Sequence, residues 1–121
     1  MRSETQLTGQ YGETIARNYL ENRGYRILEQ NYRTRWAEID LVANKGEMLV
    51  FFEVRTKIGE QFGTPEETLT RQKKWKILQN AKAYVAFKKF LGPYRIDAIC
   101  IVLGEDSKAE RISHYENIAP D

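Results

Sequence analysis

The chain has 121 residues, 41% of them hydrophobic and 30% charged, with a formal net charge of +2. This predicts one folded domain and excludes a disordered chain, while so small a charge does not demand a nucleic-acid partner. One cysteine and one histidine exclude a disulfide framework and a zinc site. No apolar stretch reaches the roughly 20 residues of a membrane-spanning helix, and the N-terminus lacks a signal-peptide core, so we expect a cytoplasmic protein.

The first predicted element is a helix that follows a flexible tail over residues 1–8. Apolar residues recur at helical spacing through Gly9–Arg23, and Gly24 follows where a left-handed cap would end the helix. Glu13 lies at the border of the apolar stripe of this helix. Tyr25–Arg33 then alternates between apolar and polar residues, which predicts a first strand.

Residues 37–57 predict a hairpin, because two apolar runs, IDLVA and MLVFFEV, flank a short polar turn. Asp40 and Glu53 lie inside these runs. A carboxylate in so apolar a strand must lose its water, which is costly unless a cation or hydrogen-bond donors compensate. Glu38 shares a face with Asp40, because side chains alternate along a strand. Arg55 shares a face with Glu53 for the same reason, so paired strands can gather four charged groups on one side of the sheet.

The second half of the chain predicts one more helix and two strands. Thr64–Glu67 matches a capping box before a helix that runs to about Phe90, where a Gly-Pro pair stops it. A start at Thr68 or Thr70 is the alternative, because two β-branched residues weaken the first turn. Tyr94–Leu103 is an apolar strand whose long crossover makes it parallel to an earlier strand. Within it we expect the acidic Asp97 to pair with a neighbouring base. Glu110–Tyr115 predicts a last edge strand.

The order helix, three strands, helix, strand, strand predicts a single-domain α/β fold, in which helices flank a mixed sheet on each side. Residues 116–121 are expected to form a second flexible tail.

The carboxylates in the hairpin predict a cation site. Hard divalent cations take oxygen ligands, and Mg²⁺ typically uses one or two protein carboxylates. We therefore expect Asp40 and Glu53 to bind Mg²⁺ or Mn²⁺, with Glu13 as a third acid and Arg55 beside a phosphate oxygen or the attacking water. Such a cation would polarise a phosphodiester. The sequence has no glycine-rich phosphate loop and no Ser-His-Asp set to suggest other chemistry.

Asp40, followed thirteen residues later by Glu53-Val54-Arg55, resembles the PD-(D/E)xK signature of the restriction-endonuclease-like nucleases, whose core has the order αβββαβ. Segments including AEIDLVA, VFFEVRTK and LTRQKKWKILQNAKAYV resemble the YraN-like family of small uncharacterised bacterial proteins. This likeness extends from about Gly12 to Ile101. The chain is also similar to archaeal Holliday-junction resolvases, which carry an acid in the first helix.

The resemblance implies catalytic roles for three acids and one lysine at matching positions, which are Glu13, Asp40, Glu53 and Lys73. A helical wheel places Lys74 nearer the inward stripe than Lys73, so only the resemblance selects Lys73. Two positions depart from the related sequences. The nuclease signature expects lysine where this chain has Arg55, and arginine cannot accept a proton near neutral pH. The family usually has glycine where this chain has Ala37.

A basic segment around Trp75 suits nucleic acid, because aromatic side chains among basic ones stack on bases. Residues of this segment and of the loops beside the hairpin are candidate nucleic-acid contacts: Arg33, Arg35, Lys57, Arg71, Lys74 and Trp75.

Three functions stay open at this point. The first is a Mg²⁺- or Mn²⁺-dependent nuclease acting on DNA, including branched or structured DNA. The second is a nucleic-acid-binding protein that keeps the nuclease fold without catalysis, which Arg55 motivates. The third is a protein-interaction module in which the acids simply pair with Arg55 and Lys73. Because junction-type nucleases are often dimers, a homodimer is an open option as well.

Overall fold

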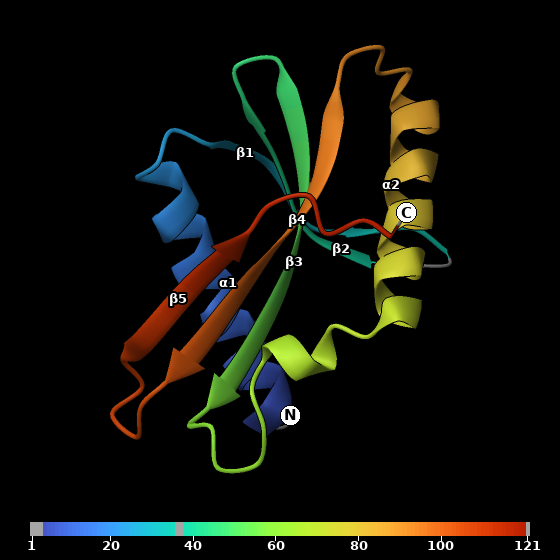
Figure 1. The fold of residues 1–121 in the computed structure, drawn as a ribbon. Helices are drawn as coiled ribbons and strands as arrows, with labels where there is room; N and C mark the ends of the chain where they lie inside the picture. The colour runs from blue at the N-terminus through green and yellow to red at the C-terminus, as the bar shows by residue number, and fades with distance from the viewer. Residues whose placement is uncertain (1–3, 36–37, 121) are drawn as a thin grey trace.

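The computed structural model describes residues 4–35 and 38–120, in which two long helices and a short 3₁₀ helix accompany five strands (Figure 1). In chain order they are α1 (Glu4–Glu21), β1 (Arg26–Arg33), β2 (Glu38–Lys45), β3 (Met48–Ile58), the short 3₁₀ helix η1 (Glu66–Thr68), α2 (Arg71–Lys88), β4 (Tyr94–Leu103) and β5 (Ala109–Tyr115). This order confirms the predicted single-domain α/β fold with an αβββαβ core. Among the described residues, no helix is both long and apolar enough to cross a membrane.

The five strands form one mixed sheet in the order β1-β2-β3-β4-β5. β3 and β4 pair in parallel, and the other neighbouring strands pair antiparallel. The parallel pair is the one that α2 connects, as the sequence predicted, because a parallel connection needs a long crossover. β5 lies at one edge and β1 at the other.

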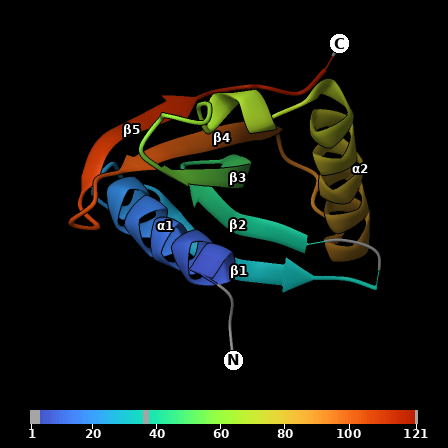
Figure 2. The ribbon, with the colours of Figure 1, turned by 90° about the horizontal axis from the view of Figure 1, so that it is seen from below.

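The two helices cover opposite faces of the sheet (Figure 2). Ala16 and Leu20 of α1 pack in one core with Phe52 of β3, whereas Ala81 of α2 packs in the other core with Phe51. Successive residues of β3 thus enter different cores, as expected of a central strand covered on both faces.

α1 begins at Glu4 instead of Gly9, so the predicted tail is wrong for residues 4–8. Residues 5–7 are exposed, with Leu7 53% exposed, so the start of α1 carries no apolar repeat that would predict a helix. The predicted end is confirmed, because Gly24 adopts a positive φ of 90° and Tyr25 N donates to Leu20 O at 3.1 Å.

α2 begins at the later of the alternative starts, after Thr70, and not at the capping box. Thr64 Oγ1 accepts a hydrogen bond from Glu67 N at 3.3 Å, but only η1 follows it. The α-helix is capped instead by Thr70, whose Oγ1 accepts from Lys73 N at 3.2 Å. It ends at Lys88, because Lys89 takes a left-handed φ of 55°.

The segment after β5 lies against the sheet, although the sequence predicted a tail over 116–121. Asn117 N donates to Asp97 Oδ1 at 3.0 Å, and Ile118 N donates to Ile96 O at 2.8 Å. Ile118 also packs against the core beside α2. These contacts with β4 fix residues 116–120; Asp121 lies outside the described residues.

Candidate functional site

The site lies where β2 and β3 stop pairing. Their ladder runs to the pair Leu41–Phe52, next to Asp40. There the Asp40 carboxylate takes over a strand hydrogen bond, since Oδ2 accepts from Val54 N at 2.8 Å. A backbone N–H satisfied by a side chain no longer needs the neighbouring strand. The sheet therefore opens at the two acids that the sequence placed inside apolar strands.

Two hollows meet at this opening, one beside α1 and one beside α2. Glu38, Asp40 and Glu53 line both. Glu13 joins them from α1, and Lys73 joins them from α2. The structure thus brings together the three predicted acids and the predicted lysine, from two helices and two strands that are far apart in the sequence.

The carboxylates of Glu13, Glu38 and Asp40 approach one another most clearly as a group. One oxygen from each lies within 4.8 Å of the other two. The predicted ligand pair was Asp40 and Glu53, and Glu53 is not in this trio, although it lines the same hollows. Glu38 was not among the predicted site residues, and its only signal was the strand face that it shares with Asp40.

Burial and mutual repulsion raise the pKa values of three of the acids at the opening. Burial raises the pKa of Asp40, and the charges of Glu53 and Glu13 raise it further. Burial also raises the pKa of Glu13, with the Glu38 carboxylate adding to the shift. The pKa of Glu53 is raised by burial as well, against the lowering effect of Arg55 and Lys73. Without a cation, the cluster therefore favours protonated carboxyls.

These residues fit a hard divalent cation. Glu13 Oε1 is buried and has no hydrogen-bond partner within the described part of the chain. A buried carboxylate oxygen without a donor is costly, and a cation would satisfy it. The trio offers only carboxylate oxygens, which Mg²⁺ and Mn²⁺ prefer over sites built from thiolate or imidazole.

Arg55 is held in place beside Glu53. Its Nη1 lies 3.4 Å from Glu53 Oε1, and its Nε donates to Thr68 Oγ1 at 2.7 Å. The Thr68 hydroxyl in turn donates to Pro65 O at 2.6 Å, which leaves an oxygen lone pair directed at Arg55. η1 therefore orients the guanidinium that stands at the position of the signature lysine.

Lys73, not Lys74, lines the hollow beside α2. The wheel had favoured Lys74. Lys73 lies one helical turn before Ile77, which lines the same hollow, so the two share a face. Its charge acts on Glu53, where it lowers the carboxyl pKa.

The remaining residues that were predicted to contact nucleic acid lie around the opening, some at its hollows and others at neighbouring ones. Trp75 is 52% exposed and lines the hollow beside α2, and Arg71 lies with it at a neighbouring hollow. Arg33 lines the hollow beside α1 and pairs with Glu38 at 3.3 Å. Lys57 lines a separate hollow with Arg55.

One predicted contact lies away from the described site. Arg35 is exposed after β1 and lines neither hollow at the opening. It adjoins residues 36–37, so the departure at Ala37 falls outside the described residues.

Asp97 belongs to a different network, which is structural. It is fully buried, and Arg95 binds it through Nε at 2.7 Å and Nη2 at 2.8 Å, as the sequence predicted. His114 Nε2 lies 2.7 Å from its other side. No partner for His114 could be predicted from the sequence, because β4 and β5 place His114 and Asp97 together only in the folded chain.

Comparisons with known proteins show where this chain belongs. The model of the uncharacterised protein family UPF0102 matches residues 12–101. A UPF0102 protein from Pelotomaculum thermopropionicum is 37% identical and covers 97% of this chain and 98% of its own length. One from Carboxydothermus hydrogenoformans is 40% identical over 91% of this chain and 92% of its own. These matches confirm the resemblance to a family of small uncharacterised bacterial proteins, and the matched region contains the four acids of the opening with Arg55 and Lys73.

Proposed function

The chain belongs to the uncharacterised protein family UPF0102, and we propose that it is a divalent-cation-dependent nuclease that hydrolyses phosphodiester bonds in DNA, including branched or structured DNA. The observation that carries this proposal is the meeting of four carboxylates with Lys73 and Arg55 at the opening between β2 and β3. The αβββαβ order and the spacing of Asp40 and Glu53 support a restriction-endonuclease-like core.

The acids of the opening would hold the cation. Asp40 is the central ligand in this proposal, since it belongs to the trio with Glu13 and Glu38 and is also close enough to Glu53 for that charge to raise its pKa. Bound there, Mg²⁺ or Mn²⁺ would polarise a phosphodiester and lower the pKa of a water. The raised pKa values of the acids mean that cation binding displaces protons, so affinity rises with pH.

The basic side chains of the opening would hold the phosphate. Arg55 presents a fixed guanidinium fork, which suits two oxygens of one phosphate. Arginine keeps its proton, so Arg55 positions but does not exchange protons. Lys73 and Lys76 both line the hollow beside α2, and in this proposal the Lys73 ammonium contacts the oxygen where charge develops.

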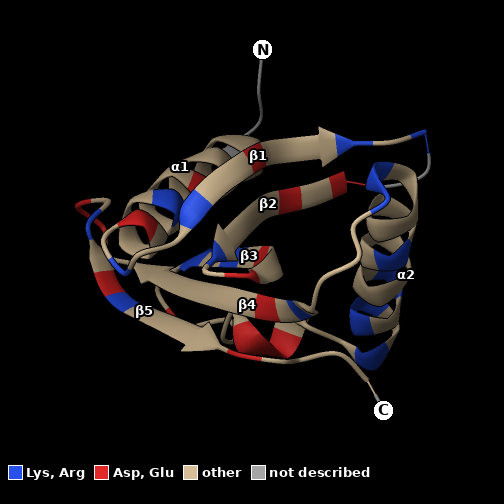
Figure 3. Cartoon of the chain, turned by 90° about the horizontal axis from the view of Figure 1, so that it is seen from above, with Lys and Arg blue, Asp and Glu red and all other residues tan. Residues whose placement is uncertain are grey.

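α2 supports a nucleic-acid partner. Its blue lysine and arginine bands in Figure 3 lie near the red acidic bands at the start of β2. Arg71 and Trp75 continue this surface beyond Lys73, with Trp75 half-exposed and available to stack on a base.

Calorimetry with Mn²⁺ and a cleavage assay test the proposal together. Wild type should bind the cation and cleave DNA, while Asp40→Asn and Glu53→Gln should lose both and stay folded by circular dichroism. Glu105→Gln, an exposed acid in the β4–β5 turn, should behave as wild type. Absence of cleavage on single-stranded, duplex, branched and RNA substrates would count decisively against a nuclease.

The second candidate is a nucleic-acid-binding protein that does not cleave, and Arg55 at the signature lysine position favours it. This alternative expects salt-sensitive binding that survives Asp40→Asn, with no turnover in any variant. An Arg55→Lys variant separates the two, because lysine restores an exchangeable proton at this position. Cleavage that appears only in Arg55→Lys supports the binding protein.

A further inference from the structure

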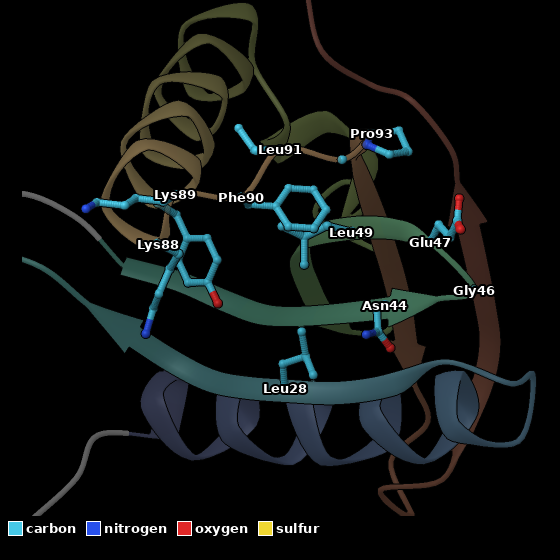
Figure 4. A pocket seen from close by; sticks show the side chains of 12 residues that line it. Leu28, Asn44, Gly46, Glu47, Leu49, Lys88, Lys89, Phe90, Leu91 and Pro93 are labelled. Atoms are coloured by element: carbon cyan, nitrogen blue, oxygen red, sulfur yellow. The ribbon is translucent and has the colours of Figure 1, made fainter.

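An apolar groove lies far from the acids, at the other end of α2 (Figure 4). The end of α2, the residues that follow it and the β2–β3 turn form its walls, and Leu28 of β1 closes it from below. Its middle is lined by Leu49, Phe90 and Pro93. The groove has a volume of about 670 Å³, which is room for several side chains.

Leu91 stands at the rim of this groove and is 99% exposed. Leu28, across the groove, is 40% exposed. A single exposed leucine is ordinary on a protein surface, but here it adjoins an apolar hollow that could receive such a side chain. The surface therefore offers both a projecting apolar side chain and a hollow of matching chemistry.

The two ends of the groove carry opposite charges. Lys88 and Lys89 lie at one end, and Glu47 lies at the other, in the β2–β3 turn (Figure 4). Lys45, the cation next to that turn, lies with its Nζ 5.1 Å from the ring of Tyr25, which packs in the core beside α1. The groove thus runs from positive through apolar to negative.

We infer that this groove binds a second copy of the same chain, in a two-fold symmetric dimer. A two-fold axis across the groove would bring the lysines of each copy to Glu47 of the other. It would also direct each Leu91 into the groove of its partner, since in such an interface every contact occurs twice. Charge complementarity with itself is what selects a second copy over an unrelated occupant.

The dimer goes beyond the proposed function and does not depend on it. Lys73 and Lys88 are fifteen residues apart on α2, which is roughly 22 Å along a helix. Both acid openings therefore stay accessible when the grooves are covered. A protein without nuclease activity could still form this dimer.

Sedimentation velocity over a concentration series tests the inference. Wild type should pass from monomer to dimer, and Leu91→Ser should raise the dissociation constant by about 100-fold, because two apolar side chains leave the interface. Such an exposed residue contributes little to monomer folding. Phe62→Ser is the matched control, since Phe62 is 93% exposed and lies in the β3–η1 loop. It should leave the dissociation constant unchanged.

A charge swap tests the orientation. Glu47→Lys and Lys89→Glu should each weaken the dimer about tenfold, and the two together should restore it. A wild type that stays monomeric throughout, or a Leu91→Ser protein that associates like wild type, would overturn the inference. So would a double variant as weak as either single one.

Discussion

Asp40 is a cost to the folded protein when no cation is bound. The pKa of Asp40 is higher in the folded than in the unfolded chain, so the folded state favours the protonated carboxyl. The free energy of unfolding is therefore unaffected by this shift below the unfolded pKa of about 3.9, and it falls as the pH rises towards the folded pKa. Asp40→Asn keeps an oxygen for Val54 N and removes the charge. We therefore expect it to melt higher than wild type at about pH 8 and alike at about pH 4, in EDTA.

Mn²⁺ should reverse this order at the higher pH, because a ligand that binds only the folded state stabilises it. Wild type should gain melting temperature and Asp40→Asn should not, while Glu105→Gln follows wild type in both conditions. A variant that melts lower than wild type in EDTA would instead support the interaction-module alternative, since breaking a buried ion pair is destabilising.

The pKa of Asp97 is shifted in the opposite direction to that of Asp40. Burial opposes its ionisation, yet hydrogen bonds from His114 and Arg95 outweigh burial and lower its pKa. The stability it contributes is present above the unfolded pKa of about 3.9 and is lost as the pH falls through the folded pKa. Asp97→Asn should lose about 3–5 kcal/mol near neutral pH, because Arg95 loses its partner.

Urea denaturation at several pH values measures this loss. The difference between Asp97→Asn and wild type should shrink as the solution becomes more acidic than the unfolded pKa. A difference that stays constant with pH would mean that the Asp97 charge is not what stabilises β4 and the segment after β5.

At the scale of elements, α1 owes its position to one close approach. Gly12 faces Thr56 of β3, and a Cβ at Gly12 would lie 1.9 Å from Thr56 Oγ1 and 2.8 Å from Thr56 Cβ. Gly12→Ala must therefore push α1 from the sheet, at a cost of about 1–3 kcal/mol, and carry Glu13 away from Asp40.

Gly9→Ala is the matched control, because nothing lies within 4 Å of a Cβ at Gly9 in the same helix. It should gain up to about 1 kcal/mol from helix propensity. Chemical denaturation of the two variants gives the comparison, and Mn²⁺ titration reports the displaced Glu13. Equal stabilities would show that α1 is not held by this contact.

The elements also show what the sequence can predict. The β2–β3 hairpin was predictable because two apolar runs flank a turn at Gly46, which has a φ of 61°. The first turn of α1 was not, since it buries little apolar surface. Asp40 and Glu53 were conspicuous as carboxylates inside apolar runs. Glu38 was not, because it is exposed at the start of β2, and its proximity to Glu13 arises only when α1 packs on the sheet.

Across the whole molecule, the net charge of +2 conceals a separation of charges. Four carboxylates gather at the opening, and lysine and arginine side chains lie along α2 beside it (Figure 3). Such a surface attracts a polyanion to α2 and directs a cation to the acids. Sequence alone places Arg71 and Lys73 on a helix, but only the fold places that helix beside β2.

This separation predicts how nucleic-acid binding responds to salt. Each lysine or arginine side chain that contacts a phosphate adds roughly one unit to the slope of log affinity against log salt concentration. Arg71→Ala and Lys73→Ala should each reduce the slope by about that amount. Trp75→Ala should weaken single-strand binding without changing the slope, because stacking releases no counterions.

Fluorescence anisotropy with a labelled oligonucleotide at several salt concentrations measures both quantities. Lys108→Ala removes an exposed lysine side chain from the β4–β5 turn, which is not part of α2. It should leave both the nucleic-acid affinity and its salt slope unchanged. If Lys108→Ala lowered the slope as much as Lys73→Ala, the polyanion would be held by net charge alone. A lower slope for Lys73→Ala than for Lys108→Ala would mean that α2 contacts the nucleic acid directly, since only basic side chains in contact with phosphates release counterions on binding.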